Sequence, residues 1–181
     1  ALGWEVMAGL HHVLPIGFGV EMNAYSEAVG RCWLIGMVAR VLSPGCKLDT
    51  MPVFEGEQGR GKSTALQVLV GQHWFAEASE SLLSKDFFQS LQGKWLIEIA
   101  EMDAFSRAEV TAVKRVITCR TDRFRPPYGR RVEDHPRMCV FAGTTNRDDW
   151  HRDETGARRF WPVTVADVDL EWLARWRDAL F

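Results

Sequence analysis

Short apolar runs alternate along the chain with stretches in which apolar residues recur every three or four positions. The runs at 51–54, 95–100, 138–142 and 160–165 have the length of buried strands. The periodic stretches predict helices at about 25–42 and 64–70, after Ser106, and from about Leu170. Strands that alternate with helices predict a parallel sheet covered on both faces.

Local signals place several element ends. The first long helix has a predicted buried stripe and stops before Ser43, Pro44 and Gly45; the stripe consists of Val29, Trp33, Met37 and Val41. Ser84 is a predicted cap of a short helix, and Ser106 with Glu109 has the spacing of a capping box. The segment 123–134, rich in proline and glycine at its centre, is typical of a turn or hairpin.

A phosphate-binding loop follows the first strand. The G-x-x-x-x-G-K-[ST] pattern is complete, and Thr64 begins the helix behind it; the loop residues are Gly56, Glu57, Gln58, Gly59, Arg60, Gly61, Lys62 and Ser63. Such a loop points backbone N–H groups at the phosphates, while Lys62 reaches the β/γ oxygens and the Ser63 hydroxyl ligates Mg²⁺. The pattern predicts ATP and Mg²⁺ as cofactors. A glycine-rich surface turn is the alternative.

Acidic residues stand in and behind the next predicted strand. We expect Glu101, which ends the apolar run, to be the main acid beside Mg²⁺, at the carboxyl end of a strand next to the loop strand. Glu98 lies inside the run, where a lone carboxylate is costly, so it is either a second candidate for metal or water or a structural partner of an arginine. Asp103 is the weakest candidate.

Two further groups complete the candidate site. Asn146 follows the apolar run 138–142 and Gly143–Thr145, where its amide can sense the γ-phosphate; a turn asparagine is the alternative. Arg158 and Arg159 are candidates for a finger that reaches the γ-phosphate of a neighbouring subunit, or else form a solvated pair.

Charge is unevenly distributed. The net charge is −2, yet the segment 114–159 holds about half of the 22 lysines and arginines; these are Lys114 and the arginines at 115, 120, 123, 125, 130, 131, 137, 147, 152, 158 and 159. This predicts a local anion-binding surface and not a generally basic protein.

Bulk composition narrows the class further. The 181 residues, 46% hydrophobic and 25% charged, fit one soluble globular domain. The four cysteines lack metal-site spacing, so we expect reduced, buried thiols and, without a signal segment or membrane span, a cytoplasmic protein. Because the chain starts at Ala1, we expect it to be part of a longer protein.

These motifs resemble the virulence-associated protein E family, phosphate-loop ATPases of phages, plasmids and genomic islands that are related to superfamily 3 helicases. The resemblance covers 25–181, with 1–24 as an unassigned lead-in. It rests on MVARVLSPGCKLD (37–49), GEQGRGKST (56–64), LQGKWLIEIAEMDAFSRAE (91–109), TDRFRPPYGRR (121–131), VFAGTTN (140–146) and DETGARRFWPV (153–163).

The resemblance implies a three-layer α/β/α NTPase core of the AAA+ or superfamily 3 type, acting as a homo-oligomeric, commonly hexameric ring in replication of mobile DNA, often with a primase region. It implies that Glu101 takes the place of the metal-binding acid, Asn146 that of the sensor, and Arg158, with Arg159 beside it, that of the finger. Met102 follows Glu101 where related helicases have a second acid, so the catalytic base is open between Glu98 and Glu101.

The resemblance also places a channel hairpin in the stretch 121–131. There Arg125, Arg130 and Arg131 would meet phosphates of single-stranded DNA, and Tyr128 would stack on a base. Some of these arginines can instead serve the nucleotide or a subunit interface. The predicted function is ATP hydrolysis coupled to single-stranded DNA; the rivals are a monomeric phosphotransferase and a nucleotide-dependent switch or loader with little turnover.

Overall fold

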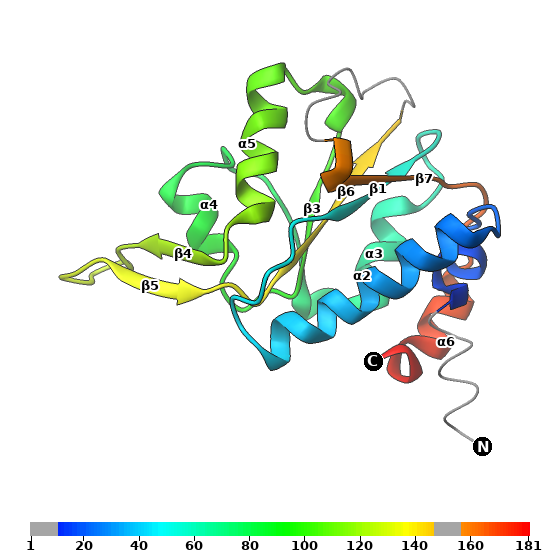
Figure 1. Cartoon of the computed structure of the whole chain (residues 1–181), viewed down its shortest axis with the longest axis horizontal. Coiled ribbons are helices and arrows are strands. Elements are labelled where there is room, and N and C mark those ends of the chain that lie inside the picture. The colour runs from blue at the N-terminus through cyan, green and yellow to red at the C-terminus, as the bar shows by residue number, and fades with distance from the viewer. Residues whose placement is uncertain (1–10, 147–156) are drawn as a thin grey trace.

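A computed structural model describes residues 11–146 and 157–181 of the chain (Figure 1). Its centre is a five-stranded sheet in the order β2-β3-β6-β1-β7, and every neighbouring pair is parallel. The strands are β1 (Met51–Glu55), β2 (Phe75–Glu77), β3 (Leu96–Ile99), β6 (Val140–Thr145) and β7 (Phe160–Thr164). The predicted parallel sheet is therefore confirmed.

One face of the sheet is covered by α2 (Ala24–Leu42), α3 (Lys62–Val70) and α6 (Leu170–Leu180), together with the short π-helix η1 (Val13–Gly17). Their apolar side chains pack on Phe54, Leu96 and Val163 of the strands. Phe18, just after η1, is buried and stacks on Phe54 with ring centroids 4.6 Å apart. The end of the lead-in is thus part of the same core as the sheet.

The other face carries α4 (Lys85–Ser90), the short 3-10 helix η3 (Met102–Ala104) and α5 (Arg107–Thr118). Ser84 caps α4, and the predicted capping box of Ser106 and Glu109 is present at α5. Val113 and Val116 of α5 pack into this second apolar cluster. With helices on both faces, the fold is a three-layer α/β/α arrangement, as the family resemblance implies.

The order of the strands differs from the expectation in one respect. The prediction placed the acidic strand beside the loop strand, but β6 lies between β1 and β3 and pairs with both. Strand β2 was not among the predicted strands; it has only three residues and is the edge strand next to β3. Beside it lies the short 3-10 helix η2 (Gln72–Trp74).

Two burial predictions are wrong. Val41 is 43% exposed, and Arg40 is buried in its place, with its guanidinium donating to the carbonyl oxygens of Arg137 and Leu48. Near its C-terminal end, helix α2 therefore buries the charged side chain of Arg40, whose hydrogen bonds are accepted by backbone carbonyl oxygens. Of the four cysteines, only Cys139 is buried; Cys32 is exposed, and the other two are half-buried.

A separate two-stranded hairpin projects beyond the layered body (Figure 1). Its antiparallel strands are β4 (Thr121–Phe124) and β5 (Glu133–Pro136), which confirms the predicted hairpin. The short 3-10 helix η4 (Ala157–Arg159) leads into β7.

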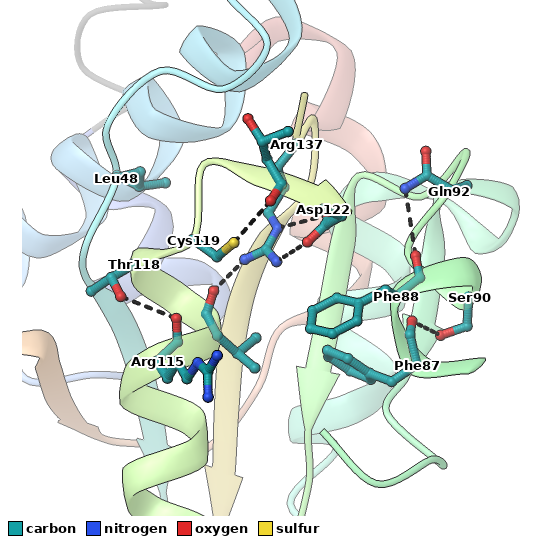
Figure 2. A network of polar contacts seen from close by, with 12 residues as sticks. Leu48, Phe87, Phe88, Ser90, Gln92, Arg115, Thr118, Cys119, Asp122 and Arg137 are labelled. Carbon is teal, nitrogen blue, oxygen red and sulfur yellow. Dashed lines mark hydrogen bonds and ion pairs between the residues drawn. The ribbon is translucent and has the colours of Figure 1, made fainter. Parts of the chain in front are cut away.

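A buried ion pair fixes the base of this hairpin (Figure 2). Arg137, directly after β5, donates to both carboxylate oxygens of Asp122 in β4 and to the carbonyl oxygen of Val116 in α5. Arg137 and Asp122 are each about 1% exposed. Arg137 is therefore a structural residue and not a part of the predicted anion-binding surface. Arg147 and Arg152, also assigned to that surface, lie outside the described residues.

None of the helices within 11–146 and 157–181 combines the length and apolar content that a bilayer crossing requires.

Candidate functional site

The phosphate-loop motif forms the turn between β1 and α3. Gly61 has a φ of 79°, in the left-handed region that favours glycine, and α3 begins at the next residue, Lys62. Gly56 passes so close to Val165 that a Cβ at this position would lie 2.8 Å from the Val165 carbonyl oxygen. Strand, glycine turn and helix therefore follow one another as the motif requires.

Lys62 lies over this turn. Its Nζ donates to the carbonyl oxygens of Gly56 at 2.5 Å and Glu57 at 2.9 Å, and contacts Oδ1 of Asn146 at 3.4 Å. Burial lowers the pKa of Lys62, and the charge of nearby Glu98 acts against this shift. The lysine and the predicted sensor asparagine, 84 residues apart in the sequence, therefore meet at one point.

The remaining loop residues form an open, polar rim. Arg60 bridges the loop to the β7–α6 connection, donating to Glu57 at 2.8 Å and to Asp167 at 2.9 Å. A cleft of about 370 Å³ opens between the loop and the tips of β3 and β6; it is lined by Gln58, Gly59, Arg60, Gly61, Lys62, Ser63, Thr64, Glu77, Ala100, Glu101, Thr144, Thr145 and Asn146.

Glu98 forms the buried acidic part of the site. Its side chain is 0% exposed, and its Oε1 accepts hydrogen bonds from the hydroxyls of Ser63 at 2.7 Å and Thr144 at 2.6 Å. Burial raises the pKa of Glu98, and these two hydrogen bonds oppose the rise. The suggested structural pair with an arginine is not what the structure contains, because the partners of Glu98 are hydroxyl groups beside Lys62.

Glu101 stands at the mouth of the cleft. It lies two residues beyond β3, has a φ of 53° and is exposed. Glu98, and not Glu101, is the acid that contacts Ser63. The sequence placed Glu101 nearest the metal because it ends the apolar run, but the side chain inside the run points to the loop across the intervening strand β6.

The tip of β6 is held by a third acid. Oδ1 of Asp103 accepts from the Thr145 hydroxyl at 3.0 Å and from the Asn146 backbone N–H at 3.3 Å. Asp103, the weakest candidate for catalysis, thus supports the segment that carries Asn146. The contacts of Thr144 and Thr145 were not predicted, although two adjacent hydroxyl residues at a strand end, which face opposite sides of the sheet, were a signal for them.

The donor atoms suit Mg²⁺. A serine hydroxyl and a carboxylate are hard oxygen ligands, which this ion prefers. The Ser63 hydroxyl donates a hydrogen bond to Glu98, so its oxygen lone pairs stay available to a cation. Within 11–146 and 157–181 no group of three or more His, Cys, Asp or Glu side chains has metal-site geometry. One hydroxyl and one carboxylate would leave the other coordination positions of Mg²⁺ to phosphate oxygens and water, which this ion commonly retains.

The two candidate finger arginines lie at the amino ends of the strands, the edge of the sheet opposite the phosphate loop. Arg158 and Arg159 directly precede β7, whose first residue pairs with Met51 at the start of β1, whereas the phosphate loop follows the end of β1. Five residues of parallel strand separate the two edges by about 17 Å. Arg158 and Arg159, with Lys47, Asp49 and Thr50, line a cleft of about 360 Å³.

The hairpin residues are at this same edge, since β5 leads into the start of β6. Tyr128 at the tip is fully exposed and has a φ of 63°. Arg125, Arg130 and Arg131 are exposed on either side of it. Gln89 of α4 contacts the hairpin on the tip side of its strands, because its Nε2 donates at 3.3 Å to the carbonyl oxygen of Arg125, which directly follows β4.

The chain has three α/β/α layers around a parallel sheet, with a glycine turn and a lysine between β1 and the next helix, and this arrangement is typical of the phosphate-loop NTPase class. Within this class, the model of the virulence-associated protein E-like domain matches residues 1–181, and the chain belongs to that family.

Solved structures share the fold. Two apo structures of the C-terminal region of NrS-1 superpose with TM-scores of 0.58 and 0.60, at 16% and 18% sequence identity. Each superposition covers 97% of this chain but only 43% or 44% of the NrS-1 region, so the chain spans less than half of that region. None of the curated proteins matches the chain.

Proposed function

We propose that this domain binds ATP with Mg²⁺ at the phosphate loop and hydrolyses it. The observation that carries the proposal is a pair of hydrogen bonds at one cleft: Lys62 contacts Asn146, and Ser63 donates to Glu98, which is buried behind the cleft wall. Lys62 and Ser63 begin the helix behind the loop strand, Glu98 lies in β3, and Asn146 follows β6, so local sequence cannot account for their meeting.

Each residue has a role that its contacts support. Lys62 holds the β/γ-phosphates, and Ser63 with Glu98 holds Mg²⁺, which neutralises phosphate charge when bound. Exposed Glu101, at the mouth of the same cleft, prepares the attacking water, a role for which solvent access is required. Asn146, beside Lys62, senses the γ-phosphate.

Hydrolysis is proposed to occur in a homo-oligomeric ring. Arg158 and Arg159 are too far from the loop of their own chain, so a finger role requires a neighbouring subunit. A ring with head-to-tail contacts brings the loop edge of one subunit to the arginine edge of the next. This separation favours the ring over a monomeric phosphotransferase, which would need its cations beside its own nucleotide.

The projecting hairpin is proposed to bind single-stranded DNA. Three exposed arginines and one fully exposed tyrosine supply phosphate contacts and a stacking surface. Membership of the virulence-associated protein E-like family supports a role in replication of phage, plasmid or other mobile DNA, in the cytoplasm of a bacterial host and alongside a primase domain or protein.

The test is the ATPase rate of Lys62→Ala. Loss of the phosphate-binding ammonium is expected to lower turnover at least about 100-fold. Lys94→Ala is the matched control, because Lys94 is half-buried and donates to the His73 carbonyl oxygen outside the cleft. Turnover of Lys62→Ala near the wild-type rate would refute the proposal, as would calorimetry that detects no ATP uptake by the wild-type protein.

A further inference from the structure

Two hydroxyl groups from different elements converge on a single oxygen of Glu98. Ser63 of α3 and Thr144 of β6 both donate to Oε1, at 2.7 and 2.6 Å, while Oε2 is buried and has no hydrogen-bond partner. We propose that Thr144 is a positioning residue of the magnesium–nucleotide site, which fixes the Glu98 carboxylate through Oε1 and leaves Oε2 for the ion and its water shell. The inference rests on the proposed nucleotide-binding function.

The order of the strands explains why Thr144 has this contact. Strand β6 lies between β1 and β3, so it separates the loop strand from the strand that carries Glu98. In the register of β3 and β6, Glu98 pairs with Ala142. Thr144 is two residues further along β6, on the same face as Ala142, and is the diagonal neighbour that a glutamate side chain can reach.

Thr144 supplies a hydrogen-bond donor to Glu98 that does not depend on a bound cation, which Ser63 alone cannot. When Ser63 ligates a cation, its geometry follows the ion, so its hold on Glu98 changes with occupancy. Thr144 is 5% exposed and belongs to a central strand, so its hydroxyl is a fixed donor whether or not an ion is bound. A hydrogen bond to a carboxylate is stronger than one between neutral groups. Its loss from a buried carboxylate costs the full desolvation penalty, because water does not replace the donor.

The neighbouring residue shows that the arrangement is specific. Thr145 is the next residue of β6, faces the other side of the sheet, and donates to Asp103 at 3.0 Å. The same substitution at 144 and at 145 therefore removes one hydroxyl from the same strand tip, but only the first touches Glu98.

The experiment measures the Mg²⁺ concentration that gives half-maximal binding of a fluorescent, non-hydrolysable ATP analogue to the 181-residue chain. For Thr144→Val this concentration is expected to rise about 10- to 100-fold. Affinity for the analogue in EDTA is expected to stay within about twofold, because the phosphate contacts of Lys62 are untouched. Thr144→Ser, which retains the hydroxyl, is expected to restore the wild-type value to within about threefold.

Thr145→Val is the matched control, with an expected shift of the Mg²⁺ midpoint below about threefold. Circular dichroism melting verifies that each variant is folded, and Thr144→Ala replaces Thr144→Val if the latter does not fold. On a Glu98→Gln background, Thr144→Val is expected to cause no further shift, because the two residues act as one unit.

An unchanged Mg²⁺ midpoint in folded Thr144→Val or Thr144→Ala refutes the positioning role while leaving the nucleotide site intact. Failure of Thr144→Ser to rescue, or an equal shift in Thr145→Val, refutes it as well. A wild-type chain that binds the analogue equally with and without Mg²⁺ refutes the proposed magnesium site, and this inference falls with it.

Discussion

The carboxyl and amino edges of the central sheet, where the parallel strands end and begin, differ in whether their charged side chains are paired within the chain or exposed to solvent. At the carboxyl edge, Lys62, Ser63, Glu98 and Asn146 hold one another within the chain, and Lys62 and Glu98 are buried. At the amino edge, the arginines of the hairpin and Arg158 point into solvent. The first arrangement suits a small, partly desolvated ligand that needs fixed geometry, whereas the second suits large anionic partners that arrive from outside.

In the proposed ring, the two ends of the sheet would serve different subunits. Because β1 and β7 are parallel and in register, a chain cannot bring its own Arg158 to its own phosphate loop without taking the sheet apart. A head-to-tail neighbour can. The comparison therefore predicts that mutations at the two edges affect different measurable quantities.

The largest expected effect comes from removing both candidate finger arginines. Arg158→Ala/Arg159→Ala is expected to lower turnover of the assembled protein by about 10³-fold or more, with the affinity for an ATP analogue retained. Mixing this variant with Lys62→Ala chains is expected to restore part of the activity, because some interfaces then pair an intact loop with intact arginines. Arg31→Ala, an exposed position in α2, is the control.

A mixture no more active than the sum of its parts would show that the arginines do not act across subunits.

The next effect distinguishes the two acids of the carboxyl edge. Glu101→Gln is expected to lower turnover about 10²- to 10⁴-fold while Mg²⁺-dependent binding of ATP persists, as for a residue that prepares water. Glu98→Gln is expected to weaken the Mg²⁺ dependence of binding itself, because it alters the carboxylate hydrogen-bonded to Ser63. Rapid-quench kinetics and binding titrations measure the two quantities, and the reverse pattern would exchange the two roles.

A smaller effect is expected at the hairpin. Replacing Arg125, Arg130 and Arg131 by alanine is expected to reduce the slope of log affinity against log salt for single-stranded DNA by about 2, since each phosphate contact contributes about 0.7. Tyr128→Ala is expected to cost about 1–3 kcal/mol of DNA binding without changing that slope. Fluorescence anisotropy at several salt concentrations measures both.

The control for the hairpin variants is Arg175→Ala in α6, which removes one exposed arginine far along the chain from the hairpin. ATP-analogue affinity is expected to remain unchanged in all of them. A hairpin variant with wild-type DNA affinity and salt slope would assign DNA binding elsewhere on the protein.

The sequence predicted well those elements that depend on short-range interactions between neighbouring residues. The capping box at Ser106 and Glu109, the apolar run that became β1 and the glycine turn after it depend on a few neighbouring residues, and all are present. The family resemblance predicted the three layers. These features depend on short-range hydrogen bonding and periodicity, which a sequence displays directly.

Features that depend on packing between distant segments were not predictable in this way. The sequence around Arg40 does not indicate that its guanidinium donates to the carbonyl oxygens of Arg137 and Leu48. Val41 has the periodicity of a buried residue, although it is exposed. The position of β6 between β1 and β3 likewise follows from tertiary topology. Without that strand order, the contact from Thr144 to Glu98 could not be foreseen.

The ion pair between Asp122 and Arg137 has a consequence for truncation and grafting. The ion pair connects β4 to the end of α5 and to the segment before β6. The base of the hairpin is therefore required for the fold, whereas its tip can be replaced. Loops of other lengths and compositions can be exchanged beyond Phe124 and before Glu133, whereas an excision that includes Asp122 strands a guanidinium in the protein interior. The tip is thus the segment to exchange in tests of the proposed DNA binding.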